Sequence, residues 1–223
     1  EPMASFAPAI KIGNQMVEQL LLHKDLDKHK AKSISIDMLN RVGIADAEKR
    51  FNQYAFELSG GMRQRAMIAM ALSTMPKLLL ADEPTTALDV TIQAQVINLM
   101  KDIIKEFNMG VIFITHDLGV IAQVADDVAV MYLGSVVEQG PVNEILKNPM
   151  HPYTKGLINA LPDINNLDAP LTPIPGNIPS PLDRPTGCVF RTRCPHASTD
   201  GKEGNIEMGL VEVKPGHWLD RCG

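Results

Sequence analysis

Two short apolar runs that end in charged or polar residues constrain the fold of this chain more than any other feature of its sequence. Residues 78–81 are followed by Asp82 and Glu83, and residues 111–115 are followed by His116. Continuous apolar runs of this kind are typical of strands in a parallel sheet covered on both faces. The stretch between them has the apolar period of an amphipathic helix. The pattern predicts a strand–helix–strand unit, and therefore an α/β fold with a parallel-sheet core.

The residues that follow the two runs have the chemistry of a phosphate-hydrolysing site. Ligands of parallel sheets bind beyond the carboxyl ends of the strands, so we expect Asp82, Glu83 and His116 to lie close together. In such sites the first carboxylate of an Asp-Glu pair holds Mg²⁺ and the second polarises the attacking water. We therefore expect Asp82 to bind the metal, Glu83 to act as the base and His116 to donate to a γ-phosphate. For an isolated Asp-Glu pair, a solvated loop that caps the next helix is the alternative.

A second candidate site lies earlier in the chain, where residues 58–65 read Leu-Ser-Gly-Gly-Met-Arg-Gln-Arg. Ser59, Gly60 and Gly61 precede a predicted helix rich in Ala and Met. The free N–H groups and the dipole of a helix N-terminus attract anions, which predicts a phosphate contact here. An ordinary serine N-cap with a glycine-rich lead-in is the alternative.

Residues 1–57 are predicted to form a helical layer. Apolar residues recur there at helical spacing in two stripes, one at Ile12, Met16 and Leu20 and the other at Ile34, Met38 and Val42. Helices with one apolar stripe bury that face, so both stripes are expected in the core.

The rest of the chain is divided by composition into two regions. Residues 58–140 contain the motifs and end in a predicted helix around residues 117–126 and a predicted hairpin of residues 128–132 and 134–140. Residues 141–223 are richer in Pro and Gly and show little periodicity in their later part. They are predicted to form a separate, loop-rich appendage.

The charge and the apolar pattern exclude some classes of protein. The net charge of -5 and the lack of a long basic block argue against nucleic acid as a partner. The sequence has no apolar run long enough to span a membrane, and its first residues lack the basic and apolar regions of a signal peptide. We expect a cytoplasmic location.

The order and spacing of the motifs in residues 58–140 resemble the ABC ATPase family. The landmarks are the Leu-Ser-Gly-Gly-x-x-Gln-Arg segment, the apolar strand with Asp-Glu-Pro-Thr, then Ala87-Leu88-Asp89, then Ile-Thr-His-Asp at residues 114–117. The resemblance implies a partial P-loop NTPase fold with ATP and Mg²⁺ as cofactors. It implies a nucleotide-binding signature segment at Leu58, Ser59, Gly60, Gly61 and Gln64, a D-loop at Asp89, a Walker B pair at Asp82 and Glu83, and a switch histidine at His116.

The same resemblance implies partners. In this family the signature loop of one subunit closes over ATP held by another, so a second, homologous ATPase subunit is expected, in a heterodimer. Two membrane permease subunits and, indirectly, an extracytoplasmic substrate-binding protein are also implied. Residues 1–57 would meet the permease, with a purely structural helical insertion as the alternative. The subunit would then be peripheral on the inner face of the cell membrane.

One motif of the family does not occur in the 223 residues. The phosphate-gripping loop requires Gly-x-x-x-x-Gly-Lys followed by Ser or Thr. In the family this loop precedes the helical region, and Glu1-Pro2-Met3 resembles the stretch that follows the Q-loop glutamine. We therefore expect this polypeptide alone to hydrolyse ATP negligibly and to expose apolar surface that a complete subunit covers. A truncated, non-catalytic fragment or interaction module is the alternative interpretation.

The tail narrows the expected substrate. His151-Pro152-Tyr153-Thr154, with later Pro-Ile-Pro-Gly and Pro-Ser-Pro segments, resembles the C-terminal extension of oligopeptide and dipeptide importers. Relatives that import nickel share this extension. The resemblance implies an ATPase that powers import of dipeptides or oligopeptides, with nickel as the alternative substrate.

The cysteines resemble a motif that holds a [4Fe–4S] cluster in some of these subunits. Such clusters are held by four thiolates. The sequence has Cys188, Cys194 and Cys222, and Gly201 stands where a further cysteine is expected. A bound cluster would need another ligand, for which His196, Asp200 and His217 are the candidates. Reduced thiols without a cluster are the alternative.

Overall fold

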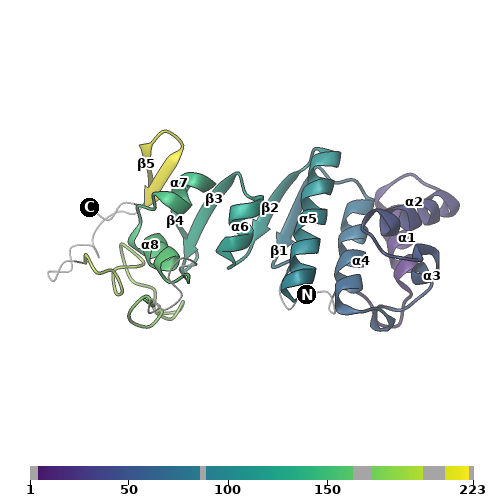
Figure 1. The fold of residues 1–223 in the computed structure, drawn as a ribbon, viewed down its shortest axis with the longest axis horizontal. Helices are drawn as coiled ribbons and strands as arrows, with labels where there is room; N and C mark the ends of the chain where they lie inside the picture. Colours follow the sequence, from purple (N-terminus) through teal and green to yellow (C-terminus); the bar gives the residue numbers. More distant parts are fainter. Residues whose placement is uncertain (1–4, 86–88, 163–171, 198–208, 221–223) are drawn as a thin grey trace. The chain divides into compact units, whose positions relative to one another are not determined.

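The computed structural model describes residues 5–85, 89–162, 172–197 and 209–220. The chain divides into two compact units, residues 1–116 and residues 117–223, and each is described by itself. The three regions predicted from the sequence have their boundaries after residues 57 and 140, which differ from the boundary between the two units. Those predicted boundaries stay predictions. The first unit contains, in chain order, α1 (Ile12–His23), α2 (Lys28–Arg41), α3 (Ala47–Phe51), the short 3-10 helix η1 (Ala55–Glu57), α4 (Gly60–Ser73), β1 (Leu78–Asp82), α5 (Val90–Phe107) and β2 (Gly110–Ile114) (Figure 1).

The helical layer of the first unit follows the predicted apolar stripes with one difference. Ile12, Met16 and Leu20 of α1 are buried as expected. In α2 the buried face is formed by Ala31, Ser35, Met38 and Leu39, whereas Ile34 is only partly buried. The serine is accommodated because its Oγ donates to the carbonyl of Ala31, four residues earlier, at 2.8 Å.

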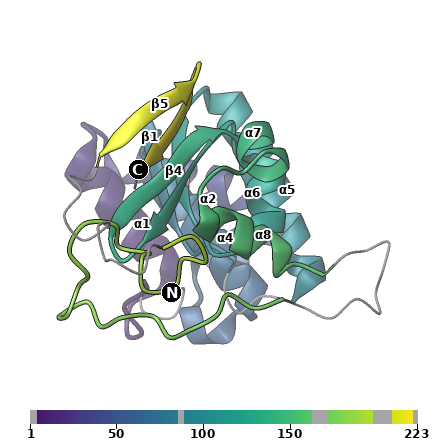
Figure 2. The ribbon, with the colours of Figure 1, turned by 90° about the vertical axis from the view of Figure 1, so that its left-hand side faces the viewer.

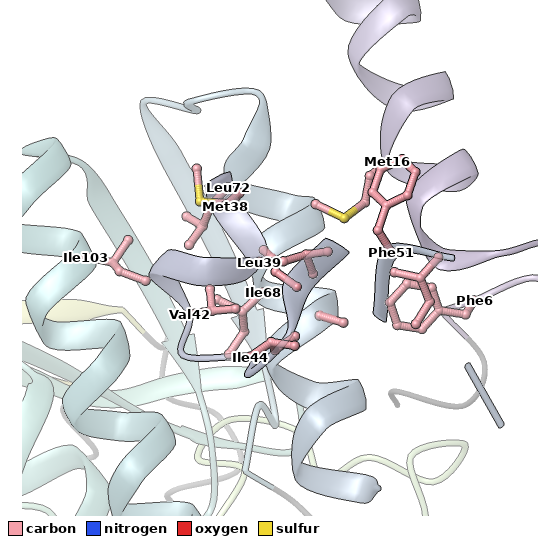
Figure 3. Close-up of a cluster of buried hydrophobic side chains, with 14 of the residues drawn as sticks. Phe6, Met16, Met38, Leu39, Val42, Ile44, Phe51, Ile68, Leu72 and Ile103 are labelled. Carbon is pink, nitrogen blue, oxygen red and sulfur yellow. The ribbon is translucent and has the colours of Figure 1, made fainter. Parts of the chain in front are cut away.

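These helices share one hydrophobic core with the strand–helix–strand unit. Figure 3 shows large side chains of this core, among them Met38, Leu39 and Phe51. Gly13 of α1 allows the close approach of Phe51, because a Cβ at this glycine would lie 2.3 Å from Cγ of the ring. The core continues into α5 through Val96, Met100 and Ile103.

The predicted strand–helix–strand unit is confirmed. β1 and β2 are parallel neighbours with α5 between them in the chain, and the register pairs Leu78 with Gly110 and Asp82 with Ile114 (Figure 1). This register brings the carboxyl ends of the two strands to one edge of the sheet.

The prediction that both faces of this sheet are buried is wrong for the described residues. Leu78 and Leu80 are 54% and 65% exposed, and Ile112 and Ile114 are each 50% exposed. Leu79, Val111 and Phe113, which alternate with them, pack against the core. In the described part of the chain the helices of this unit cover one face, so the alternate side chains form the apolar surface that the sequence predicts.

The second unit is built on an antiparallel sheet. It contains α6 (Leu118–Val124), β3 (Asp127–Tyr132), β4 (Ser135–Pro141), α7 (Val142–Lys147), α8 (Pro152–Asn159), β5 (Leu210–Lys214) and β6 (His217–Asp220). The β3–β4 hairpin and the helix before it confirm the prediction for residues 117–140. The strand order is β3-β4-β6-β5, and Figure 2 shows the β5–β6 hairpin alongside β4.

The tail after Pro141 is not the separate appendage that its composition predicts. β6 pairs with β4, so the end of the chain extends the sheet that the β3–β4 hairpin begins. Cys188, Val189 and Phe190, from an irregular segment, pack with Val130 and Tyr132 of β3 in one core. Hydrophobic periodicity failed here because the helices of the tail are short, with Ile145 of α7 and Leu157 of α8 in this core, and a loop segment supplies the rest.

Among the residues that the structure describes, no helix is long and apolar enough to cross a bilayer.

Candidate active site

The carboxyl ends of β1 and β2 bring two of the predicted functional side chains into contact. Nδ1 of His116 lies 2.7 Å from Oε1 of Glu83. The imidazole is 82% exposed and the Glu83 side chain 36%, so both groups reach solvent. The predicted proximity of these residues is therefore confirmed, while their roles stay predictions.

Glu83 is fixed by its backbone at the point where the strand ends. Its N–H donates to the carbonyl oxygen of Ile114 in β2 at 2.9 Å, which extends the strand pairing by one residue beyond Asp82. Its φ of 47° lies in the left-handed region, which is uncommon for residues other than glycine and recurs at functional sites. The turn at Glu83 therefore begins at a bonded and conformationally restricted residue.

Asp82 is the last residue of β1 and is exposed. No group of three or more His, Cys, Asp and Glu side chains able to hold a metal ion occurs among the residues that the structure describes. Mg²⁺ fits such a site nevertheless, because it retains several waters and binds through one or two carboxylates together with substrate phosphates. Asp82 with Glu83 beside it meets this requirement, and it does not require a cage of protein ligands.

The predicted anion site at residues 59–61 is the N-terminus of α4. Oγ of Ser59 accepts a hydrogen bond from the N–H of Met62 at 3.4 Å, so the serine N-cap that was the alternative is present. A Cβ at Gly60 would meet nothing within 4 Å. The space beside the first turn is therefore open to a ligand, and the cap and an anion contact are compatible.

Asp89 caps the neighbouring helix. Its Oδ1 accepts from the N–H of Ile92 at 3.0 Å at the start of α5. A Cβ at Gly61 would lie 3.0 Å from Cγ2 of Ile92, so the N-termini of α4 and α5 are close together. Ala87 and Leu88, the other two residues of the predicted D-loop, lie outside the described residues.

Two predicted nucleotide-binding residues point into the protein. Leu58 is 4% exposed and belongs to the core, and Gln64 is 1% exposed. Nε2 of Gln64 donates to the carbonyl oxygen of Pro84, next to Glu83. This burial favours a role in holding the Glu83 turn over the direct nucleotide contact predicted for Gln64. The spacing of the motif contains no signal for this bond.

Arg65 is a further residue near the site to which sequence analysis assigned no role. Its Nη1 donates to the carbonyl oxygen of Val42 at 2.8 Å, and its Nη2 donates to Oε1 of Gln95 at 3.0 Å. One side chain on α4 thus joins the end of α2 to α5.

The cysteine motif lies in the second unit. Cys188 is 2% exposed and Cys194 is partly buried beside the same core. His217, one of the candidate cluster ligands, is buried, and its Nε2 lies 2.7 Å from Oε1 of Glu138, which opposes a role as a ligand. Cys222, Asp200 and Gly201 lie outside the described residues, and the cluster stays a prediction.

Two family models match different parts of the chain. The model described as "ABC transporter" matches residues 3–86. The model described as "Oligopeptide/dipeptide transporter, C-terminal region" matches residues 137–200. The first match contains the α4 N-terminus and the Glu83 turn. The second contains most of β4, the helices α7 and α8, and the segment of Cys188 and Phe190 that packs in the core of the second unit.

Curated relatives match at about half of all aligned positions. The oligopeptide transport ATP-binding protein AppD of Bacillus subtilis is 51% identical over 197 residues, which are 88% of this chain and 60% of that protein. The oligopeptide transport ATP-binding protein OppD of Salmonella typhimurium is 50% identical over 88% of this chain and 59% of that protein. The chain therefore spans about 60% of the length of these relatives.

Solved structures show the same fold. The structure of cbiO1 from Clostridium perfringens, part of the ABC transporter complex cbiONQ, matches with a TM-score of 0.57 at 27% identity, over 66% of this chain and 57% of that chain. An inward-facing conformation of a putative metal-chelate type ABC transporter matches with a TM-score of 0.57 at 24% identity, over 67% of this chain and 58% of that chain. The mixed α/β fold is thus that of ABC ATPases, as the sequence predicts.

Proposed function

Because the chain belongs to the ATP-binding proteins of oligopeptide and dipeptide ABC transporters, we propose that it is part of a subunit that hydrolyses ATP to power peptide import. The observation that carries the proposal is the contact between His116 and Glu83 at the ends of β1 and β2, with Asp82 beside it. A base, a hydrogen-bonding partner for it and a metal-binding carboxylate are three of the groups that act in phosphate hydrolysis.

In the proposed reaction Glu83 takes a proton from a water molecule. The water oxygen bonds to the γ-phosphorus of ATP as the bond from that phosphorus to the β,γ-bridging oxygen breaks, and ADP leaves with the electron pair. His116, bonded to the carboxylate of Glu83, fixes the direction of the base and contacts the γ-phosphate. Mg²⁺ bound near Asp82 would neutralise phosphate charge.

The α4 N-terminus serves a different ATP in this proposal. Residues 59–61 close over nucleotide held by the partner ATPase subunit, and Asp89 lies at the same interface. The open space beside Gly60 supports this assignment, since it lets phosphate approach the first N–H groups of the helix. Hydrolysis would then release the two subunits, and that movement would drive the permeases.

The proposed substrate is a dipeptide or oligopeptide, with nickel as the alternative. The match of residues 137–200 to the oligopeptide/dipeptide C-terminal region supports the peptide. The proposed partners are a second ATPase subunit, forming a heterodimer, and two permease subunits at the inner face of the membrane, with a substrate-binding protein acting indirectly. Nucleic acid is not a proposed partner.

A non-catalytic fragment or interaction module is a second candidate for this polypeptide by itself. The apolar face of β1 and β2, with Leu80 65% exposed, supports it, since an ATPase core with covered faces would bury such side chains. On this proposal the isolated 223-residue chain hydrolyses ATP negligibly, because it lacks the phosphate-gripping motif.

Replacement of the base tests the leading proposal. In the intact subunit assembled with its permeases, Glu83→Gln should lower the rate of ATP hydrolysis by about 10²–10⁴-fold, the usual contribution of a general base, while ATP binding is retained. Asp102→Asn, at an exposed position of α5 outside the predicted permease-contacting residues 1–57, is the control and should hydrolyse ATP normally. Membrane vesicles that contain the wild-type subunit assembled with its permeases should take up labelled peptide and not Ni²⁺. An active Glu83→Gln subunit would exclude the assigned role of Glu83.

A further inference from the structure

Gln64 is a polar side chain in the interior of the first unit. It lies on α4 with 1% of its surface exposed, and its Nε2 donates to the carbonyl oxygen of Pro84. A buried amide without a hydrogen bond destabilises a fold, so the pairing of this amide with this carbonyl fixes how α4 meets the loop after β1.

The acceptor of this bond lies in the turn that contains Glu83. The N–H of Glu83 is bonded to the carbonyl oxygen of Ile114, and Thr85 is 6% exposed. Proline has no N–H group, so its carbonyl is the hydrogen-bonding group through which the backbone of Pro84 is held. The turn is therefore attached to β2 on one side of Pro84 and to α4 at Pro84 itself.

The same helix begins at the candidate anion site. Ser59 caps α4, and Gly61 in its first turn lies against Ile92 of α5. α4 runs unbroken from Gly60 to Ser73 and includes Gln64. One continuous helix and one hydrogen bond therefore connect the candidate anion site to the residue after Glu83.

We propose that Gln64 is a positioning residue that couples the signature loop to the base Glu83. The inference rests on the proposed function, in which residues 59–61 contact the partner's ATP while Glu83 acts on the ATP of its own subunit. Closure of the loop over one nucleotide then sets the position of the base at the other. Gln64 thereby couples the two ATP sites of the dimer.

The first test removes the donor and keeps the shape of the side chain. Gln64→Met, in the intact subunit assembled with its permeases, should lower kcat for ATP by about tenfold, as expected when a hydrogen bond that positions a catalytic group is lost. KM should stay within about twofold, because no nucleotide contact is removed. The Hill coefficient for ATP should fall towards that of independent sites. Gln123→Met, at an exposed position of α6, is the matched control.

The second test keeps the proposal falsifiable if the methionine variant fails to fold. In Gln64→Glu only the protonated carboxyl can donate to the Pro84 carbonyl. The ratio of its kcat to that of the wild type should therefore rise as the pH falls. Because an ionised carboxylate at this buried position also destabilises the fold, kcat is compared only at pH values where urea unfolding shows the variant to be folded. A ratio independent of pH in that range would contradict the proposal.

The outcomes separate the inference from the proposed function. A raised KM with unchanged kcat in Gln64→Met would make Gln64 a nucleotide contact and overturn the coupling. Unchanged kcat and Hill coefficient would overturn it as well. If the wild type and Gln123→Met are themselves inactive, the proposed function fails, and the inference fails with it.

Discussion

Glu138 shows how a charged side chain is accommodated in the interior of the second unit. It is 0% exposed, and its Oε1 accepts from the N–H of Met150 and lies beside Nε2 of His217, each at 2.7 Å. Its Oε2 accepts from the N–H of His151 at 3.0 Å. A buried carboxylate is tolerated when donors surround it in this way. One residue of β4 thus holds both β6 and the segment that leads into α8.

His151 makes the stability of the second unit depend on pH. Burial lowers the pKa of its imidazole from 6.5 to about 4, although the nearby charge of Glu138 acts to raise it. Between those pH values the unfolded chain binds a proton that the folded chain does not, so stability is present above pH 6.5 and is lost as the pH falls towards 4. The full loss is roughly 3 kcal/mol. Urea unfolding of the chain from pH 4 to pH 8 measures it.

An asparagine at position 151 is the matched control for the pH effect. His151 caps α8 by accepting from the N–H of Tyr153 at 3.1 Å, and asparagine is also a good N-cap. His151→Asn should be less stable at neutral pH, because the contact of the imidazole with the ring of Phe190 is lost. Its free energy of unfolding should vary less between pH 4 and pH 6.5 than that of the wild type. An equal slope in both proteins would assign the pH dependence to other groups.

The candidate site was predictable where its chemistry is local in the sequence. Glu83 and His116 each follow an apolar run, so the strand pairing alone brings them together. The bond from Gln64 to Pro84 spans 20 residues, and the bond from Arg65 to Val42 spans 23. Such bonds depend on how the elements pack, and a motif or a hydrophobic period contains no information about this packing.

At the scale of elements, a side chain of α4 joins the end of α2 to α5. Arg65 bonds the carbonyl oxygen of Val42, which follows α2, and the side chain of Gln95 in α5. Gly43, next to Val42, has a φ of 75°, and a Cβ there would lie 2.8 Å from Nη1 of Arg65. The guanidinium therefore occupies a space that the glycine leaves open.

Loss of this guanidinium should loosen α2 from α4 and α5. Arg65→Met should lower the free energy of unfolding by about 1–3 kcal/mol, because it removes two hydrogen bonds and leaves the carbonyl of Val42 without its donor. Arg65→Lys should recover part of this loss, since an ammonium lacks the fork that reaches both acceptors. Lys101→Met, at an exposed position of α5, removes a charge without such contacts and should change stability little. Equal effects of the methionine variants in urea unfolding would contradict the role of Arg65.

The type and limits of the elements were more predictable than their environment. The apolar period correctly predicted α1, α5 and the pairing of β1 with β2. It did not predict that Leu80 and Ile112 are exposed, because a strand's sequence shows that both its faces are apolar and not whether another layer covers the second face. In the helix α2 the cause is different: an apolar period counts only apolar residues, so it predicted that Ile34 is buried and missed the buried Ser35 beside it.

At the scale of the whole chain, the end of the sequence completes a sheet that begins 90 or so residues earlier, a long-range pairing of the kind that composition does not reveal. β6 lies between β4 and β5 in the strand order. Leu219 and Trp218 pair with Glu138 and Gln139. Stability of the β3–β4 hairpin is therefore expected to depend on residues 209–220.

Deletion of residues 209–223 should weaken the second unit and leave the first unchanged. The deletion removes β5 and β6, exposes one edge of β4 and takes away His217, so the fully buried Glu138 loses one of its partners. Amide exchange should accelerate in β3, β4 and α8 by more than tenfold, which corresponds to about 1.4 kcal/mol of lost protection. Exchange in α4 and α5 should keep its wild-type rate, because these helices belong to the other compact unit. Glu144→Gln removes the ion pair with Lys214 and keeps an oxygen that can accept from Nδ2 of Asn148, so it serves as the control and should leave exchange in β4 nearly unchanged. Equal acceleration in both units would show that they unfold together.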